Sequence, residues 1–417
     1  MPRHLAVTAL FVLLHAAPQA SASAAGPVPL GLTEPVVAAA GDGQVVVAGL
    51  RRSKVEMMRV DGGGRVLERR TVGGGRSADV RVAVAGRRIA VSWIEDQRTL
   101  VLARRALGGA RFTFDGTSNS GILFHRLAMN ARGVVVDAFK DVDNAATETR
   151  TGIAGLVARP GQIARRVMIA PRDARNTNLP EVGVDAAGGF HVSWISDVFP
   201  QQPVLGVAGA DAEGRFGAPA EQGFGSSLSR LQVRTAGDGG QLAAFQRHSG
   251  RGHVLLSTSR RPPGGPWESP VVRFDLGNES RGHDLAVGPT GDAFLTFGPD
   301  PDQDSPGLLR AVLVPAGGPA TVVPLGRGTG VGGLVDEQGR ARAVWGDPRG
   351  AGSTQTVLVD VRGGRVGRVR TALRGCRPDP FDDPVPLRPV GRPDGPLAFS
   401  LTCGRRGRTA LLQPDVR

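Results

Sequence analysis

The stretch VSWIED at positions 91–96 returns as VSWISD at positions 192–197. Alternating polar and apolar residues that lead to an aromatic and then to an acidic residue are typical of a buried β-strand followed by a turn. A phrase that recurs along a chain indicates one structural unit used several times. The shared Asp then either caps a turn common to all units or belongs to a ring of ligands that faces one space.

A Gly-containing turn between two strand-like runs recurs along the whole chain. The intervals between these turns, 43 to 56 residues, match the length of a four-stranded propeller blade. A second Gly-rich turn, such as RPPGGPW at 261–267, separates a third run from a fourth. Gly suits tight hairpins because it adopts positive φ. The first set of turns contains Gly43, Gly86, Gly133, Gly188, Gly239, Gly291, Gly339 and Gly395.

These units predict an all-β chain that forms a single closed β-propeller with eight four-stranded blades, or with seven as the alternative. The eighth unit is short, with PLAFSLTC at 396–403 and TALLQP at 409–414 before the chain ends. We expect GPVPLGL at 26–32 to supply the strand that this unit lacks. Both ends of the chain would then pair in one blade and leave no open edge.

With its repeat length and with hairpins such as SRRPPGGPWESP at 259–270, the chain resembles secreted bacterial β-propeller proteins of the sialidase-like and WD40-like kind. The resemblance implies an architecture and no activity, because propellers carry many unrelated functions. Sialidases use a tyrosine nucleophile and carry S-x-D-x-G-x-x-W boxes. This chain contains no Tyr and no such box, so sialidase activity is not expected.

The first 24 residues predict a Sec-type signal peptide: the basic MPRH is followed by the apolar LAVTALFVLLHAA and by small residues before the cut. Residues 25–417 would then form the propeller, a secreted or periplasmic monomer without a transmembrane segment. The two cysteines of the chain, Cys376 and Cys403, both lie in this exported part. An oxidising compartment favours a disulfide between them, and two buried free thiols are the alternative.

The net charge is +13, but the basic residues are scattered and aromatic residues make up only 5% of the chain. Nucleic-acid binding usually requires a clustered basic surface with aromatic side chains for stacking, so it is not expected. A polysaccharide, a protein or a small ligand is the expected partner, and the sequence does not decide among them.

The core aromatic of six units is followed, two or three residues later, by Asp or His. In a propeller the loops after the second strand of each blade lie on one face, around the channel. There these side chains either cap their own loops by accepting backbone N–H bonds or form a ring that binds a cation or a basic group. The residues are Asp96, Asp141, Asp197, His248, Asp300 and Asp347.

The segment DPDQDSPG at 300–307 is a candidate calcium site, because Asp300, Asp302 and Asp304 alternate as carboxylate ligands of a hard cation do. It resembles the D-x-D-x-D-G calcium loops. It departs from them where Ser305 replaces the turn Gly and Ala311 replaces the twelfth-position Glu. A solvated acidic loop is the alternative.

Five histidines follow the predicted signal peptide, and together with Asp79 or Asp284 they are candidates for a metal or acid–base site. These histidines are His125, His191, His248, His253 and His283.

We expect an exported, non-enzymatic propeller that presents a rigid loop face to a ligand. The alternative is a lyase or glycoside hydrolase that uses Asp and His at the channel mouth, with or without a divalent cation. A titratable pair within hydrogen-bond reach and with perturbed pKa values would favour the enzyme. Carboxylates that are bonded within their own loops would favour the scaffold.

Overall fold

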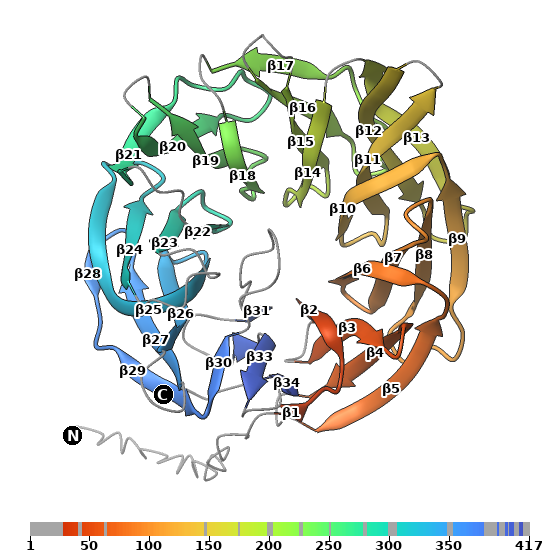
Figure 1. Cartoon of the computed structure of the whole chain (residues 1–417), viewed down its shortest axis with the longest axis horizontal. Helices are drawn as coiled ribbons and strands as arrows, with labels where there is room; N and C mark the ends of the chain where they lie inside the picture. The colour runs from red at the N-terminus through yellow and green to blue at the C-terminus, as the bar shows by residue number, and fades with distance from the viewer. Residues whose placement is uncertain are drawn as a thin grey trace, which may run out of the picture.

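The computed structural model describes residues 28–40, 44–61, 65–145, 148–173, 176–197, 203–224, 228–249, 252–277, 282–298, 307–347, 353–378, 390–391, 397–398, 400–403 and 408–411. All regular elements in these ranges are β-strands, as the alternating pattern predicts. Figure 1 shows the sheets placed one after another around a common centre. None of the described residues forms a helix that is long and apolar enough to cross a membrane.

The repeated unit is a sheet of four consecutive antiparallel strands, which we call a blade and number along the chain. The first strand of each blade lies nearest the centre and the fourth lies outermost (Figure 1). Blades one to three contain β2 (Thr33–Ala39), β3 (Val45–Arg51), β4 (Lys54–Val60), β5 (Val66–Gly73); β6 (Ser77–Ala85), β7 (Arg88–Glu95), β8 (Thr99–Ala106), β9 (Thr113–Ser118); and β10 (Gly121–Met129), β11 (Val135–Ala145), β12 (Glu148–Ala158), β13 (Arg165–Asp173).

Blades six and seven share a strand, since β25 pairs with β24 through its first half and with β26 through its second. Blades four to seven contain β14 (Asn176–Val184), β15 (Phe190–Asp197), β16 (Val204–Ala210), β17 (Ala220–Gly223); β18 (Leu228–Thr235), β19 (Gln241–His248), β20 (Val254–Arg261), β21 (Val271–Asp275); β22 (Gly282–Val287), β23 (Ala293–Gly298), β24 (Gly307–Val314), β25 (Thr321–Val335); and β26 (Arg340–Asp347), β27 (Ser353–Asp360), β28 (Arg365–Val366), β29 (Arg370–Arg374).

A further sheet, the terminal sheet, joins the two ends of the chain. Its order is β1 (Val28–Pro29), β34 (Arg408–Leu411), β33 (Ser400–Cys403) and β30 (Cys376–Pro378). The predicted pairing of the N-terminal segment with the last strands is therefore present, with Val28 opposite Leu411. Cys376 and Cys403 lie directly opposite each other in the register of β30 and β33. A short pair, β31 (Val390–Gly391) and β32 (Leu397–Ala398), lies apart from this sheet.

The turns between the first and second strands take the conformation that the glycine pattern predicts. Of the eight turn glycines, Gly43 and Gly395 lie outside the described residues. The other six all have positive φ: Gly86, Gly133, Gly188, Gly239, Gly291 and Gly339. Glycine therefore recurs at these turns because the backbone there has a conformation that other residues rarely adopt.

The core lies between neighbouring blades and is centred on the aromatic residue of each second strand. Trp93, Trp194 and Trp345 are at most 1% exposed, which confirms the prediction that the tryptophans of the repeated phrase belong to the core. Each indole packs directly against a glycine, either on the adjacent strand of its sheet (Gly206 and Gly328) or on the outer strand of the preceding blade (Gly73). A β-carbon at any of these glycines would fall within about 2.5 Å of a ring atom. The indole therefore fits only because the glycine has no side chain.

Candidate functional site at the inner strands

The innermost strands carry a β-bulge at one equivalent place, which the repeat pattern of the sequence does not reveal. In blades one to five and in blade seven, two residues of the inner strand oppose one residue of the second strand. In blades two to five and seven that single residue is the core aromatic. Blade six pairs without a bulge, with His283 opposite Phe297.

The first bulge residue has a left-handed backbone in four of these strands. Asp79, Phe124 and Arg230 have φ of 51°, 46° and 51°, and Gly330 has 57°. Non-glycine residues rarely adopt this conformation, which clusters at sites where a strand is bent to redirect a side chain. The bulges therefore give the inner rim a specialised backbone.

A polar side chain follows the bulge and reaches across to the next blade. The register places Arg81, Arg126, Glu181, Gln232 and Asp284 at one equivalent position in blades two to six, each opposite the residue before the core aromatic. We call these five residues the clasp residues. Four of them are 8% exposed or less, so their polar groups need partners within the protein.

The contacts of the clasp residues run from blade to blade around the centre. Arg81 donates to the backbone oxygen of His125 at 3.2 Å, and Arg126 donates to the Glu181 carboxylate at 3.5 Å. That carboxylate also accepts from Arg234 of blade five at 3.1 Å.

In blades five and six the clasp is made to the backbone of the following inner strand. Gln232 donates to the His283 carbonyl at 2.8 Å and accepts from the Leu285 N–H at 2.7 Å, so its amide substitutes for a peptide group. Asp284 accepts from the Gly333 N–H of blade seven at 3.0 Å. These side chains therefore hold neighbouring sheets together.

His125 is the most heavily bonded of the histidines that the sequence singles out. It is fully buried, with Nδ1 2.9 Å from Asp137 Oδ1 and Nε2 2.5 Å from the carbonyl oxygen of Asp79. Burial opposes the charged ring, but the Asp137 and Asp79 carboxylates outweigh it and raise the pKa of His125. With both nitrogens engaged and no exposed surface, the ring ties the bulge of blade two to blade three and is closed to a substrate.

His283 occupies the corresponding place in blade six, opposite a core phenylalanine, but lies in the opposite electrostatic setting. Burial, together with Arg230 and Arg234, lowers the pKa of His283 to about 4, so the ring is neutral at neutral pH. Its Nδ1 lies 3.1 Å from Gln246 Nε2. His283 and His125 therefore do not form one site, and neither joins His253, which pairs with Asp275 at 2.9 Å on the surface.

The six residues predicted as a loop-face ring divide into two sets. Asp141 and Asp347 lie two residues after the core aromatic and are buried, whereas Asp96 and His248 lie three residues after it and are exposed. Asp141 lies within β11, whereas Asp96 follows β7 in a turn, with φ of 50°, and His248 is the last residue of β19. The side chain of Asp197, at the end of β15, and the whole of Asp300 lie outside the described residues.

Asp141 is part of an ion-pair cluster inside blade three. Its carboxylate accepts from Arg166 Nη2 and Arg172 Nε at 2.6 Å each and also from the Asn119 amide. Arg172 reaches Asp143 as well, at 3.0 Å. A fully buried carboxylate with three donors is satisfied within its own blade and is not available to an external cation.

The candidate calcium residues Asp300, Asp302 and Asp304 lie outside the described residues. Within the described residues, no group of three or more His, Cys, Asp or Glu side chains is arranged to hold a metal ion.

Comparison with known proteins supports the architecture and nothing finer. No family model and no curated protein matches the chain. Among solved structures, the WD40 domain of SCAP from fission yeast superposes with a TM-score of 0.53 at 7% identity, over 94% of this chain and 98% of that one. A prolyl endopeptidase superposes with a TM-score of 0.50 at 10% identity. The match covers 91% of this chain and 55% of the prolyl endopeptidase, so this chain spans about half of that protein's length.

The β-propeller domain of the trilobed protease from Pyrococcus furiosus superposes with a TM-score of 0.44 at 12% identity, over 82% of this chain and 95% of that one. The WD40 domain and the prolyl endopeptidase propeller, with TM-scores of 0.50 or more, are β-propellers, and the chain shares that fold. At such identities the likeness shows the fold alone.

Proposed function

We propose that this protein is an exported, non-enzymatic propeller that binds a ligand through its loop face. In this proposal residues 1–24 are removed as a signal peptide, and the terminal sheet closes a ring of eight blades. Cys376 and Cys403, which lie opposite each other in that sheet, form a disulfide. The observation that carries the proposal is the use of the inner-rim polar groups as clasps between blades.

The clasp argues against catalysis at the channel mouth for a physical reason. A general acid or base must bring a titratable atom within hydrogen-bond reach of its substrate. His125 has a perturbed pKa and carboxylate neighbours, but it is fully buried and both its nitrogens are bonded. Arg126 and Glu181 bond across the boundary between blades three and four. Such an arrangement favours rigidity over proton transfer.

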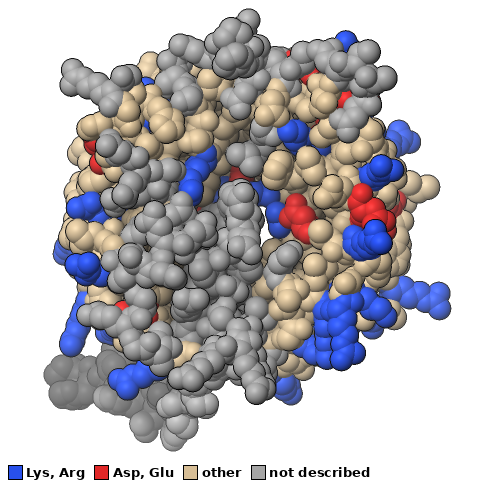
Figure 2. Space-filling view, viewed as in Figure 1, with Lys and Arg blue, Asp and Glu red and all other residues tan. Residues whose placement is uncertain are grey.

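The exposed charge near the second-to-third-strand turns favours an anionic partner. The turn between β3 and β4 contains Arg51, Arg52 and Lys54, all exposed, where blades two to seven have Asp or His in the sequence. Figure 2 shows Lys and Arg side chains gathered over this part of the molecule. A surface of this kind attracts polyanions and raises the rate at which they associate. An acidic polysaccharide therefore fits this surface better than a neutral one.

The test compares binding and turnover on the same probes. The mature chain is immobilised and exposed to polygalacturonate and to dextran, and the released sugar is assayed for reducing ends and for absorbance of unsaturated products. We expect polygalacturonate to be retained in a salt-dependent manner without cleavage, and dextran not to be retained. Replacing Arg52 and Lys54 with Gln should weaken retention, whereas the exposed but distant Arg165→Gln should not. Cleavage products that require the wild-type chain would establish the enzymatic alternative instead.

A further inference from the structure

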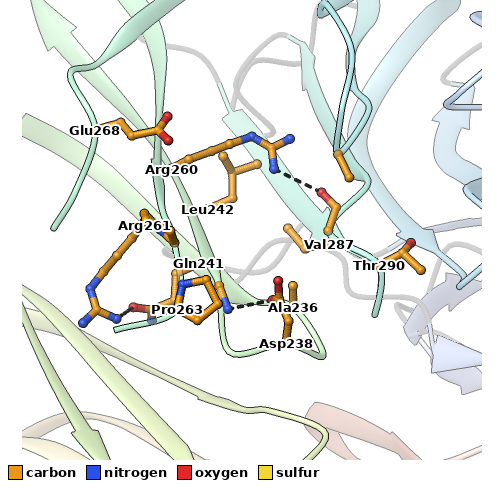
Figure 3. Close-up of a pocket in the computed structure, with 14 residues that line it drawn as sticks. Ala236, Asp238, Gln241, Leu242, Arg260, Arg261, Pro263, Glu268, Val287 and Thr290 are labelled. Carbon is orange, nitrogen blue, oxygen red and sulfur yellow. Dashed lines mark hydrogen bonds between the residues drawn. The ribbon is translucent and has the colours of Figure 1, made fainter. Parts of the chain in front are cut away.

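The boundary between blades five and six contains a pocket whose surroundings differ from those at the equivalent boundary between blades two and three. The pocket has a volume of about 220 Å³ and lies among the turns at the end of the strands opposite to the loop face. At about 30 Å³ per water molecule, this is the space of roughly seven waters. Figure 3 shows Arg260 extending along this pocket toward blade six, with Glu268 nearby.

Arg260 and Arg104 are equivalent residues in their blades. Each lies on the third strand, opposite the residue three places before the core aromatic: Arg104 opposite Ala90 and Arg260 opposite Leu242. Both guanidinium groups cross to the next blade and donate to backbone carbonyls at its turns.

Arg104 donates to the carbonyls of Arg159 and Gln162 at 2.8 Å each. Arg260 donates to the Pro315 carbonyl at 3.0 Å, and more distantly to those of Gly291 and Val314. At both boundaries, therefore, an equivalent arginine donates to backbone carbonyls of the next blade.

The difference lies in the negative charge beside the arginine. In blade two, Asp115 of the fourth strand accepts from Arg104 Nε at 3.2 Å and makes an ion pair with its Nη2. Asp115 is opposite Leu102 in the register, and the equivalent pair in blade five is Thr258 and Val271. Blade five thus carries a valine, 48% exposed, where blade two carries the carboxylate.

No carboxylate of the described residues replaces the one that blade five lacks. Arg260 forms no ion pair there, and Glu268 and Asp238 line the pocket beyond ion-pair distance of it. A second cation, Arg273, lies near and donates from Nε to Thr258 at 2.7 Å. Burial and the charge of Arg260 lower the pKa of Arg273, as expected when two cations share a partly buried place without an anion between them.

We propose that this pocket binds the carboxylate of a small organic acid, which takes the place that Asp115 occupies in blade two. In blade two the equivalent guanidinium, that of Arg104, is paired with a carboxylate. Arg261, which lines the pocket beside Arg260, adds a second positive charge. The pocket accommodates a molecule of the size of a single sugar acid. It is distinct from the proposed polyanion surface, which lies at the other end of the strands.

Glucuronate is a suitable probe and glucose its uncharged control, with binding to the mature chain measured by titration calorimetry. We expect glucuronate to bind at one site per chain and glucose not to bind. Arg260→Gln should weaken glucuronate at least tenfold, since a charge-assisted hydrogen bond is lost. Glu268→Gln should tighten it, because a like charge leaves the pocket. Arg165→Gln, which removes an exposed arginine elsewhere, should leave the affinity unchanged.

The decisive variant is Val271→Asp, which supplies blade five with the carboxylate of blade two. It should abolish glucuronate binding and raise the midpoint of thermal unfolding, whereas a variant that had merely lost its fold would lower that midpoint. The reciprocal Asp115→Val should create a second glucuronate site per chain. The proposal is overturned if the wild type binds no glucuronate at about 10 mM, if Val271→Asp binds it unchanged, or if inorganic phosphate competes as well as a carboxylate does.

Discussion

Replacing Gly206 with Ala tests whether the core tryptophans can pack only because the residue that each indole contacts is a glycine. Gly206 lies on β16 directly opposite Trp194. A β-carbon there would lie 2.1 Å, 2.3 Å and 2.5 Å from Cε2, Nε1 and Cζ2 of the indole. Carbon atoms in contact prefer about 3.5–4.0 Å, so the ring would have to move by more than about 1 Å. It is fully buried, so little space is open to it.

Overpacking of this kind typically destabilises a protein by about 1–3 kcal/mol. Gly209 provides a matched control, because it lies on the same strand, is exposed, and a β-carbon added there would have nothing within 4 Å. Gly209→Ala should be neutral or stabilise by up to about 1 kcal/mol, since alanine restricts the unfolded chain. The two substitutions are therefore expected to differ by about 2 kcal/mol or more in the free energy of unfolding.

Equilibrium unfolding in urea, followed by tryptophan fluorescence, measures this difference directly. Fluorescence also reports whether the environment of the indole changes in the folded variant. If Gly206→Ala proves as stable as Gly209→Ala, the close approach of strand and ring does not constrain the fold, and the reasoning from glycine positions fails.

Three further outcomes follow from the structure. Asp137→Asn should lower the free energy of unfolding by roughly 3 kcal/mol near pH 5.5. This destabilisation should shrink as the pH rises through the raised pKa of His125. The stability contributed by a raised pKa is complete below the pKa of the unfolded chain, about 6.5, and is lost above the pKa of the folded protein. An equal loss of unfolding free energy in urea at both ends of this pH range would contradict the assignment. If Cys376 and Cys403 form the proposed disulfide, its reduction should cost about 3.5 kcal/mol of stability, and thiol titration of the oxidised, denatured chain should find no free thiol. Calcium at a hundredfold its Kd should stabilise the chelator-treated protein by about 2.7 kcal/mol, and Asp302→Ala should remove that gain. An unchanged midpoint of thermal unfolding would show that residues 300–307 are an acidic loop that binds no calcium.

The repeat and its turns could be predicted from the sequence because they depend on local chemistry. Gly86 and Gly291 are required by backbone conformation, and the tryptophan of VSWIED by the alternation of its strand. Such features recur at a fixed spacing whatever the neighbouring blade contains. The pairing of the N-terminal segment with the last strands could be predicted as well, because the final unit visibly lacks a strand.

The inner rim could not be predicted in the same way. A bulge adds one residue to a strand and so breaks the alternation on which sequence patterns depend, as at Asp79 and Phe124. The clasp residues are chemically unlike one another: an arginine, a glutamate and a glutamine take one structural position at Arg126, Glu181 and Gln232. Their shared role appears only once the register is known.

The difference in burial between Asp141 and the exposed loop residues could not be predicted from the spacing either. Counting two or three residues from an aromatic places Asp141 and Asp96 in one class. Asp141 lies within the long strand β11 and is buried, whereas Asp96 lies in the turn after β7 and is exposed.

The clasp also determines where the molecule is weakest. At the equivalent position blade one has Val36 and blade seven has Gly332, so neither offers a polar side chain to its neighbour. These are the two blades that flank the terminal sheet in Figure 1. Native-state opening begins where the fewest interactions must break. Backbone amides of β2 and of the second half of β25 should therefore exchange with solvent before those of β10 and β14. The boundaries between blades one and two and between blade seven and the terminal sheet should open first.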